Sequence, residues 1–400
     1  MSISNSADNH HLSGKQLTLL ALCMYCINMG QTLVFAILPA LGREVGLREV
    51  QITFLISTSA LIYSFMSVRW GRLSDRFGRR PLIILGLAGY SVGNALFAGS
   101  FYLGLTAVLT GTTFYVVAYM TRLMQSSVMS ATNPAVTAYI ADNAAPAGRQ
   151  RAYAKIGAAT NLGTITGPAV AGFLASISLL APLLFSSVLT FLAMLGIAVM
   201  LPASRQLIDR NARAKLRYND ARYRHFILAT LGVFLAYSSV QQTLAFTLQD
   251  SLGLDAVDTV QYTGMVLMLG AISSVFAQMV LIQGWDLSPQ QFIRRGVSLM
   301  TAGLLIYATV PSFYGLLIGM CIHGLGLGLT MPNIFSGASM SVEVHDQGAI
   351  SGLISSIPAM GFILGPVLAG LLYEWTPAAP PYFAFGVMSV TAIWLWWEHH

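Results

Sequence analysis

The chain has 400 residues, of which 55% are hydrophobic and only 9% are charged, and its formal net charge is +6. Because an average soluble domain carries about 25% charged residues, this composition excludes an ordinary water-soluble protein. The positive charge is spread over separate short segments, so we expect no nucleic-acid partner.

Apolar segments near 20 residues long recur along the whole chain. A helix needs about 20 residues, at 1.5 Å each, to cross roughly 30 Å of hydrocarbon. The twelve segments cover residues 17–38, 51–70, 81–105, 114–140, 152–175, 180–201, 225–249, 260–283, 294–311, 313–337, 349–373 and 380–397. We therefore predict an all-α membrane protein with twelve transmembrane helices. The first 14 residues lack the basic region of a signal peptide, so we expect the first segment to be retained as a span.

Lys and Arg residues are distributed unevenly around these segments. If the amino terminus is cytoplasmic, each of the 21 lies in or beside a cytoplasmic loop except Arg43, Arg48 and Arg122. Positive residues favour cytoplasmic loops, so we expect both termini in the cytoplasm. The longest loop, 202–224, is basic and separates an amino-terminal six-helix half, 1–201, from a carboxy-terminal half, 225–400.

The two halves repeat each other in sequence. Residues 163–172 read GTITGPAVAG, and residues 361–370, 198 positions later, read GFILGPVLAG. An offset of 211 pairs Gln31 with Gln242. Small residues four apart let helices pack closely, and a mid-span Gly-Pro bends a helix, which favours either a gating role or ordinary close packing. The repeated positions are Gly163, Gly167, Pro168 and Gly172 in the first half and Gly361, Gly365, Pro366 and Gly370 in the second.

Several motifs together resemble the major facilitator superfamily. Residues 71–81, GRLSDRFGRRP, look like its signature loop between the second and third spans, and Arg122-x-x-Gln125 resembles its fourth-span motif. Residues 163–172 are similar to the fifth-span motif associated with its antiporters. The resemblance covers the whole chain, with the drug and metabolite exporters as its best branch. It implies two pseudo-symmetric six-helix halves around a central cavity, in a bacterial inner membrane, working as a monomer.

The signature loop also agrees with simple chemistry. Gly78 suits a tight turn, and Pro81 suits the start of the third helix. The resemblance implies that Asp75 bonds the amino terminus of the eleventh span and latches the outward-open state; a solvated Asp75 in a topological loop is the alternative. The residues expected to form this latch are Gly71, Asp75, Arg76, Gly78, Arg79, Arg80 and Asp142.

Polar side chains deep inside spans are the best candidates for a binding site, because burying them in hydrocarbon is costly. Only Arg122 and His323 are ionisable there, tyrosines and cysteines aside, and the repeat places His323 opposite Gln125. The resembled family lines its cavity with the first, fourth, seventh and tenth spans, which predicts a substrate cavity of Asn28, Gln31, Arg122, Gln125, Gln242 and His323. The alternatives are interhelical hydrogen bonds for Gln31 and Gln242, a structural anchor for Arg122 and a packing role for His323.

The energy source follows from what the sequence lacks. No nucleotide-binding motif, metal cluster or catalytic pair is visible, so we expect no enzyme activity, no cofactor and no metal. Cys23, Cys26 and Cys321 lie inside apolar segments and are expected to be buried thiols. A proton that enters down about 100 mV and one pH unit releases roughly 3.7 kcal/mol. This free energy sustains a several hundred-fold concentration gradient of substrate for each proton, so proton antiport is a sufficient energy source.

These observations predict a secondary transporter that exports a small drug or metabolite by alternating access, coupled to protons. The alternative is a symporter or uniporter that imports a nutrient. Arg122 is the only fixed charge expected in the cavity, which favours an anionic or zwitterionic substrate, including a carboxylate siderophore. The resembled exporters usually carry a carboxylate on the first span, where this chain has Asn28 and Gln31. His323 and Arg122 are therefore the candidates for proton coupling.

Overall fold

A computed structural model describes residues 12–144, 146–202, 218–343 and 346–397, and the described residues contain helices and no strand. The first half comprises α1 (Gly14–Glu44), α2 (Glu49–Phe77), α3 (Arg79–Leu105), α4 (Gly111–Met129), α5 (Thr132–Asn143), α6 (Pro146–Ala175) and α7 (Ala181–Met200). The second comprises α8 (Arg224–Leu252), α9 (Ala256–Phe276), η1 (Ala277–Leu281), α10 (Ile282–Gly284), α11 (Pro289–Thr309), α12 (Phe313–Met340), α13 (Gln347–Trp375) and α14 (Ala379–Trp397). Most of the predicted loop 202–224 lies outside the described residues.

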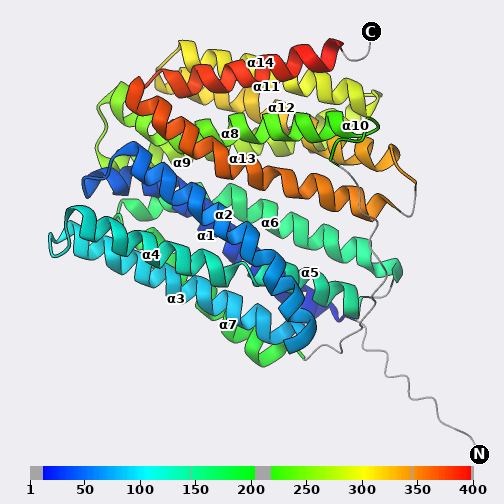
Figure 1. Ribbon diagram of the computed structural model, residues 1–400, viewed down its shortest axis with the longest axis horizontal. Helices are drawn as coiled ribbons and strands as arrows, with labels where there is room; N and C mark the ends of the chain where they lie inside the picture. Colours follow the sequence, from blue (N-terminus) through cyan, green and yellow to red (C-terminus); the bar gives the residue numbers. More distant parts are fainter. Residues whose placement is uncertain (1–11, 145, 203–217, 344–345, 398–400) are drawn as a thin grey trace, which may run out of the picture.

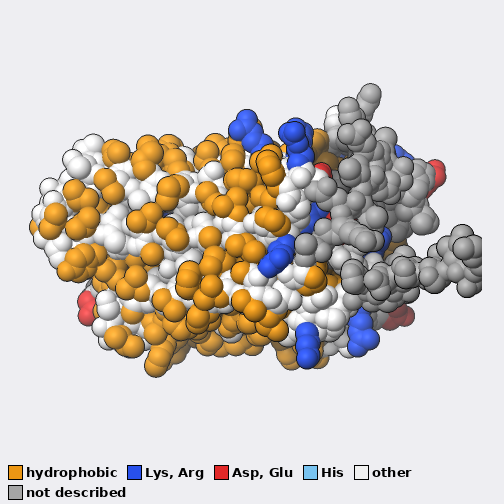
Figure 2. Space-filling view, turned by 90° about the horizontal axis from the view of Figure 1, so that it is seen from below, with side chains coloured by type: hydrophobic (Ala, Val, Ile, Leu, Met, Phe, Trp, Pro, Cys, Tyr) orange, Lys and Arg blue, Asp and Glu red, His pale blue; other side chains and the backbone are white. Residues whose placement is uncertain are grey.

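The predicted twelve-span, all-α architecture is confirmed. Eight helices are long and apolar enough to cross a membrane by length and composition: α1, α2, α3, α7, α8, α9 with its continuation to Gly284, α12 and α13. The remaining four spans are α4 together with α5, and the single helices α6, α11 and α14. Hydrophobic side chains cover most of the face in Figure 2, and Lys and Arg gather toward one end.

Local chemistry explains where several helices begin. Ser13 accepts a hydrogen bond from the Gln16 amide while the Gln16 side chain bonds back to Ser13, a capping box that starts α1. Gly78, between α2 and α3, has φ of +92°, a conformation that side chains disfavour. The tight turn expected at Gly78 is therefore present, although Pro81 is the third rather than the first residue of α3.

The predicted continuous span 114–140 is wrong in one respect, because the helix is broken between α4 and α5 at Ser130 and Ala131. Pro134 lacks an amide hydrogen and cannot continue the hydrogen-bond ladder. The Trp70 indole and the Ser130 hydroxyl both donate to the Ser127 carbonyl at the break, at 2.7 Å each. The matching Pro332 lies inside the unbroken α12.

Each half is packed internally, and the halves meet mainly along two helix pairs, with smaller contacts of α1 on α8 and α9. α1 packs on α6 and α3 on α7 in the first half, while α8 packs on α13 and α11 on α12 in the second. Across the halves, α6 packs on α9 and α2 on α13 (Figure 1). The end of α1 and the start of α2 define what we call the Arg43 end of the bundle; the opposite end, where α1 begins and α14 finishes, is the Asp75 end.

The two crossings between the halves are related by the sequence repeat. A Cβ placed on Gly172 of α6 would lie 3.1 Å from the Cα atom of Gln261 in α9. A Cβ on Gly370 of α13 would lie 3.2 Å from the Cα atom of Val50 in α2. Gly370 follows Gly172 by 198 positions and Gln261 follows Val50 by 211, the two offsets of the internal repeat. The pseudo-symmetry in the sequence therefore describes real equivalent contacts.

Candidate functional site

Three of the predicted cavity residues form one hydrogen-bonded group in the first half. Arg122 of α4 donates from Nη1 to Gln125 Oε1 at 2.7 Å and from Nη2 to Gln31 Oε1 of α1 at 3.2 Å. Gln125 and Arg122 are three residues apart and therefore share one face of α4. We call these three residues the arginine site.

The arginine site continues into α3 through a residue that the sequence analysis missed. Gln125 donates to Asn94 Oδ1 at 3.2 Å, and Asn94 donates to the Leu183 carbonyl at 2.7 Å and the Ser186 hydroxyl at 2.8 Å. Gln31 also donates to the Met129 sulfur at 3.0 Å. Asn94 was detectable, because an asparagine stands inside the apolar segment 81–105 without a nearby turn.

The arginine site carries a positive charge that no carboxylate balances in the described hydrogen bonds. The Arg122 side chain is 2% exposed, its Nε has no hydrogen-bond partner, and its guanidinium lies 5.5 Å from the centre of the Phe97 ring. Amide oxygens and an aromatic face stabilise a cation only partly. An anionic group brought to this site would gain more there than a neutral or cationic one.

The remaining predicted cavity residues do not join this group. Asn28 donates to the Met24 carbonyl of its own helix at 2.7 Å. Gln242 and His323 lie in the second half, are 0% and 1% exposed, and have no hydrogen-bond partner at either polar side-chain atom. The polar side chains of the arginine site in the first half are therefore hydrogen-bonded to one another, whereas Gln242 and His323 in the second half are not hydrogen-bonded.

Aromatic rings connect His323 to the first half. His323 of α12 stacks on Tyr237 of α8 with ring centres 5.9 Å apart, and Tyr237 meets Phe362 of α13 edge-on at 6.4 Å. Phe362 in turn stacks on Phe35 of α1 at 6.1 Å. Phe35 is one helical turn from Gln31, so this aromatic row ends next to the arginine site.

The predicted latch residues form contacts inside the first half. Arg79 makes an ion pair with Asp75, and its Nε lies 2.9 Å from Asp142 Oδ2. Arg80 donates to the Ala198 carbonyl, and Pro134 is the neighbour that a Cβ on Gly71 would meet. Asp75 thus pairs with Arg79 in this conformation. Its expected bond to the amino terminus of α13 stays a prediction for a conformation closed at the Asp75 end.

The repeated glycine motif divides into two roles. A Cβ on Gly167 would lie 2.1 Å from Thr32 Oγ1 in α1, and one on Gly365 would lie 2.0 Å from Ser238 Oγ in α8, so both glycines hold a half together. Gly163 and Gly361 likewise face α1 and α8, whereas Gly172 and Gly370 contact the opposite half. Pro168 and Pro366 lie inside α6 and α13. Only the last glycine of each motif is placed to act between the halves.

The cysteines carry no site. Cys23 and Cys26 are buried, Cys321 is half-buried, and all three are free thiols. Within the described ranges, no three His, Cys, Asp or Glu side chains gather in a way that could hold a metal ion.

Comparison with known sequences matches residues 20–357 to the model of the Major Facilitator Superfamily. The chain is 24% identical over 383 residues to "Multidrug resistance protein 1" of Bacillus subtilis (strain 168), covering 94% of each chain. It is also 24% identical over 386 residues to "Quinolone resistance protein NorA" of Staphylococcus aureus (strain MSSA476), covering 93% of this chain and 94% of the relative.

Solved structures share the fold at low sequence identity. A bacterial homologue of the iron transporter ferroportin in an inward-facing state aligns with a TM-score of 0.73 and 15% identity, over 96% of this chain and 98% of that one. A bacterial homologue of the human lysosomal transporter Spinster, in an inward-facing and occupied conformation, aligns with a TM-score of 0.71 and 14% identity, over 95% and 93%.

Proposed function

The chain belongs to the Major Facilitator Superfamily and is a multi-pass membrane transporter rather than an enzyme, and we propose that it is a proton-coupled exporter of small organic molecules. The observation that carries this proposal is a pair of internally packed halves that meet through two crossings related by the sequence repeat, α6 on α9 and α2 on α13. Resemblance over nearly the full length to two bacterial proteins named for drug resistance supports export.

Alternating access is supported by where the halves touch. The described ion pairs, ring contacts and close glycine approaches between them run from Phe35 and Phe362, near the middle of the bundle, to Arg43 and Asp250. With the basic loops cytoplasmic, the Asp75 end is the inner one, and this conformation is closed to the outside.

The substrate is proposed to be a small anion or zwitterion, a class that includes carboxylate siderophores. The unbalanced charge of Arg122 supports an anionic group at the arginine site, since guanidinium and carboxylate match in geometry. Gln242 and His323 are buried without partners, and a substrate that hydrogen-bonds to them would remove the penalty of about 1–3 kcal/mol for each unsatisfied group.

The direction and coupling of transport can be tested in intact cells. Cells that express the protein and are loaded with an aromatic carboxylate, a zwitterionic quinolone or a lipophilic cation should retain less of the first two than cells without it. An uncoupler should make the exporting cells fill, because the proton gradient drives efflux. If the uncoupler instead empties them, the protein is an importer, the alternative function.

His323 is proposed to carry the exchanged proton. It is a buried histidine inside α12, a histidine ordinarily titrates near neutral pH, and no carboxylate is described beside it. In reconstituted liposomes, His323→Gln should lose substrate-driven proton movement, because glutamine keeps hydrogen bonding without titrating. Proton movement that persists at the wild-type stoichiometry in this variant would assign the proton to another group.

A further inference from the structure

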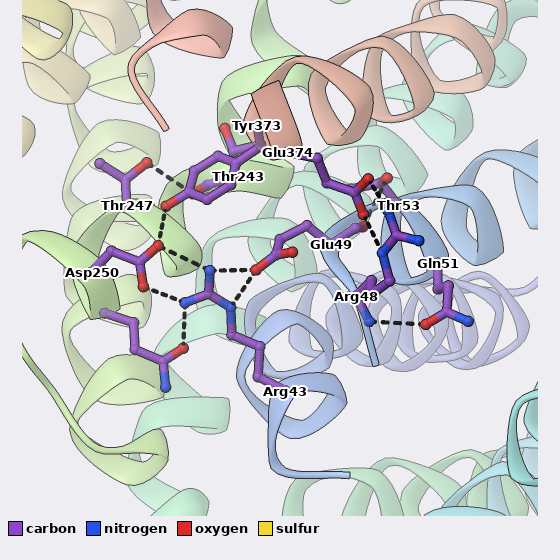
Figure 3. A network of polar contacts seen from close by, with 11 residues as sticks. Arg43, Arg48, Glu49, Gln51, Thr53, Thr243, Thr247, Asp250, Tyr373 and Glu374 are labelled. Carbon is purple, nitrogen blue, oxygen red and sulfur yellow. Dashed lines mark hydrogen bonds and ion pairs between the residues drawn. The ribbon is translucent and has the colours of Figure 1, made fainter. Parts of the chain in front are cut away.

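A network of charged side chains joins the two halves at the Arg43 end (Figure 3). Arg43 of α1 donates from Nη1 to Asp250 Oδ1 of α8 at 2.5 Å and from Nη2 to Asp250 Oδ2 at 2.9 Å. The same guanidinium donates from Nε and Nη2 to Glu49 Oε1 of α2, at 3.0 and 2.6 Å. One arginine therefore holds a carboxylate from each half.

The Arg43–Asp250 pair has the features of a strong ion pair. It is bidentate, and the side chains of Arg43 and Asp250 are 16% and 38% exposed. The Arg43 guanidinium lies 4.8 Å from the centre of the Phe246 ring, and Asp250 Oδ2 also accepts a hydrogen bond from Tyr373 Oη at 2.7 Å. The fixed geometry and the low exposure of Arg43 strengthen the pair relative to a fully exposed ion pair.

Both members of this pair keep a partner in their own half when the halves separate. Arg43 retains Glu49, and Asp250 retains Tyr373. A buried ion pair whose members have no other partner is costly to break, because each charge is left alone. Here the pair can open without isolating either charge, which suits a contact that forms and breaks in every transport cycle.

A second bidentate ion pair lies at the same end, and its arginine is more solvated than Arg43. Arg48, just before α2, donates from Nε to Glu374 Oε1 of α13 at 3.0 Å and from Nη2 to Glu374 Oε2, and the two side chains are 69% and 21% exposed. Exposed pairs contribute about 0–1 kcal/mol. Glu374 therefore offers a matched comparison: it is a carboxylate between the same halves, in a solvated pair.

We propose that Arg43 and Asp250 form a gate at the outer end of the transporter, which holds that end closed and opens when Asp250 binds a proton from outside. This gate rests on the proposed function, because it assumes an alternating-access cycle. The groups that face Asp250 are Arg43 from α1, Tyr373 from α13 and Gln249 of its own helix, with Glu49 of α2 on the far side of the guanidinium.

The direction of the pH effect follows from the charges. Ionised Asp250 pairs with Arg43, and this contribution is present above the pKa of the carboxyl group. As pH falls through that pKa, protonation removes the charge on Asp250, and Arg43 keeps Glu49 as its charged partner and Gln249 as a neutral one. Acid outside therefore favours opening of the outer end. The proton that opens the gate at Asp250 is not the proton exchanged for substrate. The exchanged proton must be carried inward, while the outer end is closing.

The gate can be tested by measuring the distance between nitroxide labels in the purified, reconstituted protein. Thr106, after α3, and Thr309, at the end of α11, are exposed at the Arg43 end in opposite halves, and Cys23, Cys26 and Cys321 would first be replaced by alanine. At pH 7.5, Asp250→Asn should raise the ratio of open to closed outer ends about tenfold. Glu374→Gln should change it less than about twofold.

Lowering the pH below about 4, where an aspartate carboxyl group ordinarily takes up its proton, should open the outer end of the wild type, and Asp250→Asn should lose most of that response. The proposal is overturned if Asp250→Asn has the wild-type distance distribution, or if its pH response is undiminished. Arg43→Lys keeps the positive charge but loses the bidentate geometry, so it should open the outer end partially. This variant replaces Asp250→Asn in the test if Asp250→Asn does not fold. If the wild-type protein does not export any of the test compounds from intact cells, the proposed function is overturned, whatever distances the labels report.

Discussion

Arg122→Gln is expected to lower kcat/KM for an exported organic anion by at least about thirtyfold, because truncating one member of a buried charged pair costs about 2–5 kcal/mol. The substitution removes the only charge of the arginine site and takes hydrogen-bond donors from Gln31 and Gln125. Most of the loss should appear as a higher KM, since the charge is proposed to contact substrate. Transport in liposomes over a range of anion concentrations measures both constants.

Two further variants separate the charge from its structural role. Gln31→Glu would place a carboxylate at the oxygen that lies 3.2 Å from Arg122 Nη2, and it should raise the KM for anions while Arg122 stays in place. Arg69→Gln removes an exposed arginine of α2 and should leave both constants unchanged. If Arg122→Gln lowers the amount of folded protein but transports anions with an ordinary KM, Arg122 is a structural anchor.

Gly370→Leu is expected to slow export at least about tenfold while the protein still reaches the membrane. A Cβ at this position would lie 2.0 Å from Thr53 Oγ1 of the opposite half, so a leucine overpacks the α2–α13 crossing. Overpacking costs typically about 1–3 kcal/mol, and here it applies only when the Arg43 end is closed. The transporter should accumulate with its outer end open, which the Thr106 and Thr309 labels would report.

Matched substitutions on α13 check this interpretation. Gly352→Leu meets no atom within 4 Å and should transport normally. Gly365→Leu crowds Ser238 within the same half, so it should reduce the yield of folded protein rather than shift the two conformations. Wild-type export by Gly370→Leu would show that the crossing tolerates a larger side chain and does not control closure.

The sequence by itself determined the class of the protein and its division into halves. Inside the bilayer, where no water is present, an α-helix is the simplest structure that satisfies every backbone hydrogen bond within one segment. Apolar segments of the right length therefore predict the spans directly. The internal repeat relates the two crossings that Gly172 and Gly370 make with the opposite half. Arg122, Gln31 and Gln125 were found because polar side chains are rare inside spans, and their helical spacing placed two of them on one face.

Only the tertiary structure decided which of these side chains meet. Helical periodicity tells which residues share a face but not which neighbouring helix covers it, so Asn94 was missed, and the sequence did not show that Gln242 and His323 stand outside the hydrogen bonds of the arginine site. Arg43 and Asp250 are 207 positions apart and resemble ordinary charges at the ends of spans. Their pairing depends on how the two halves are rocked against each other, and a sequence common to all conformations of the transport cycle does not specify one of them.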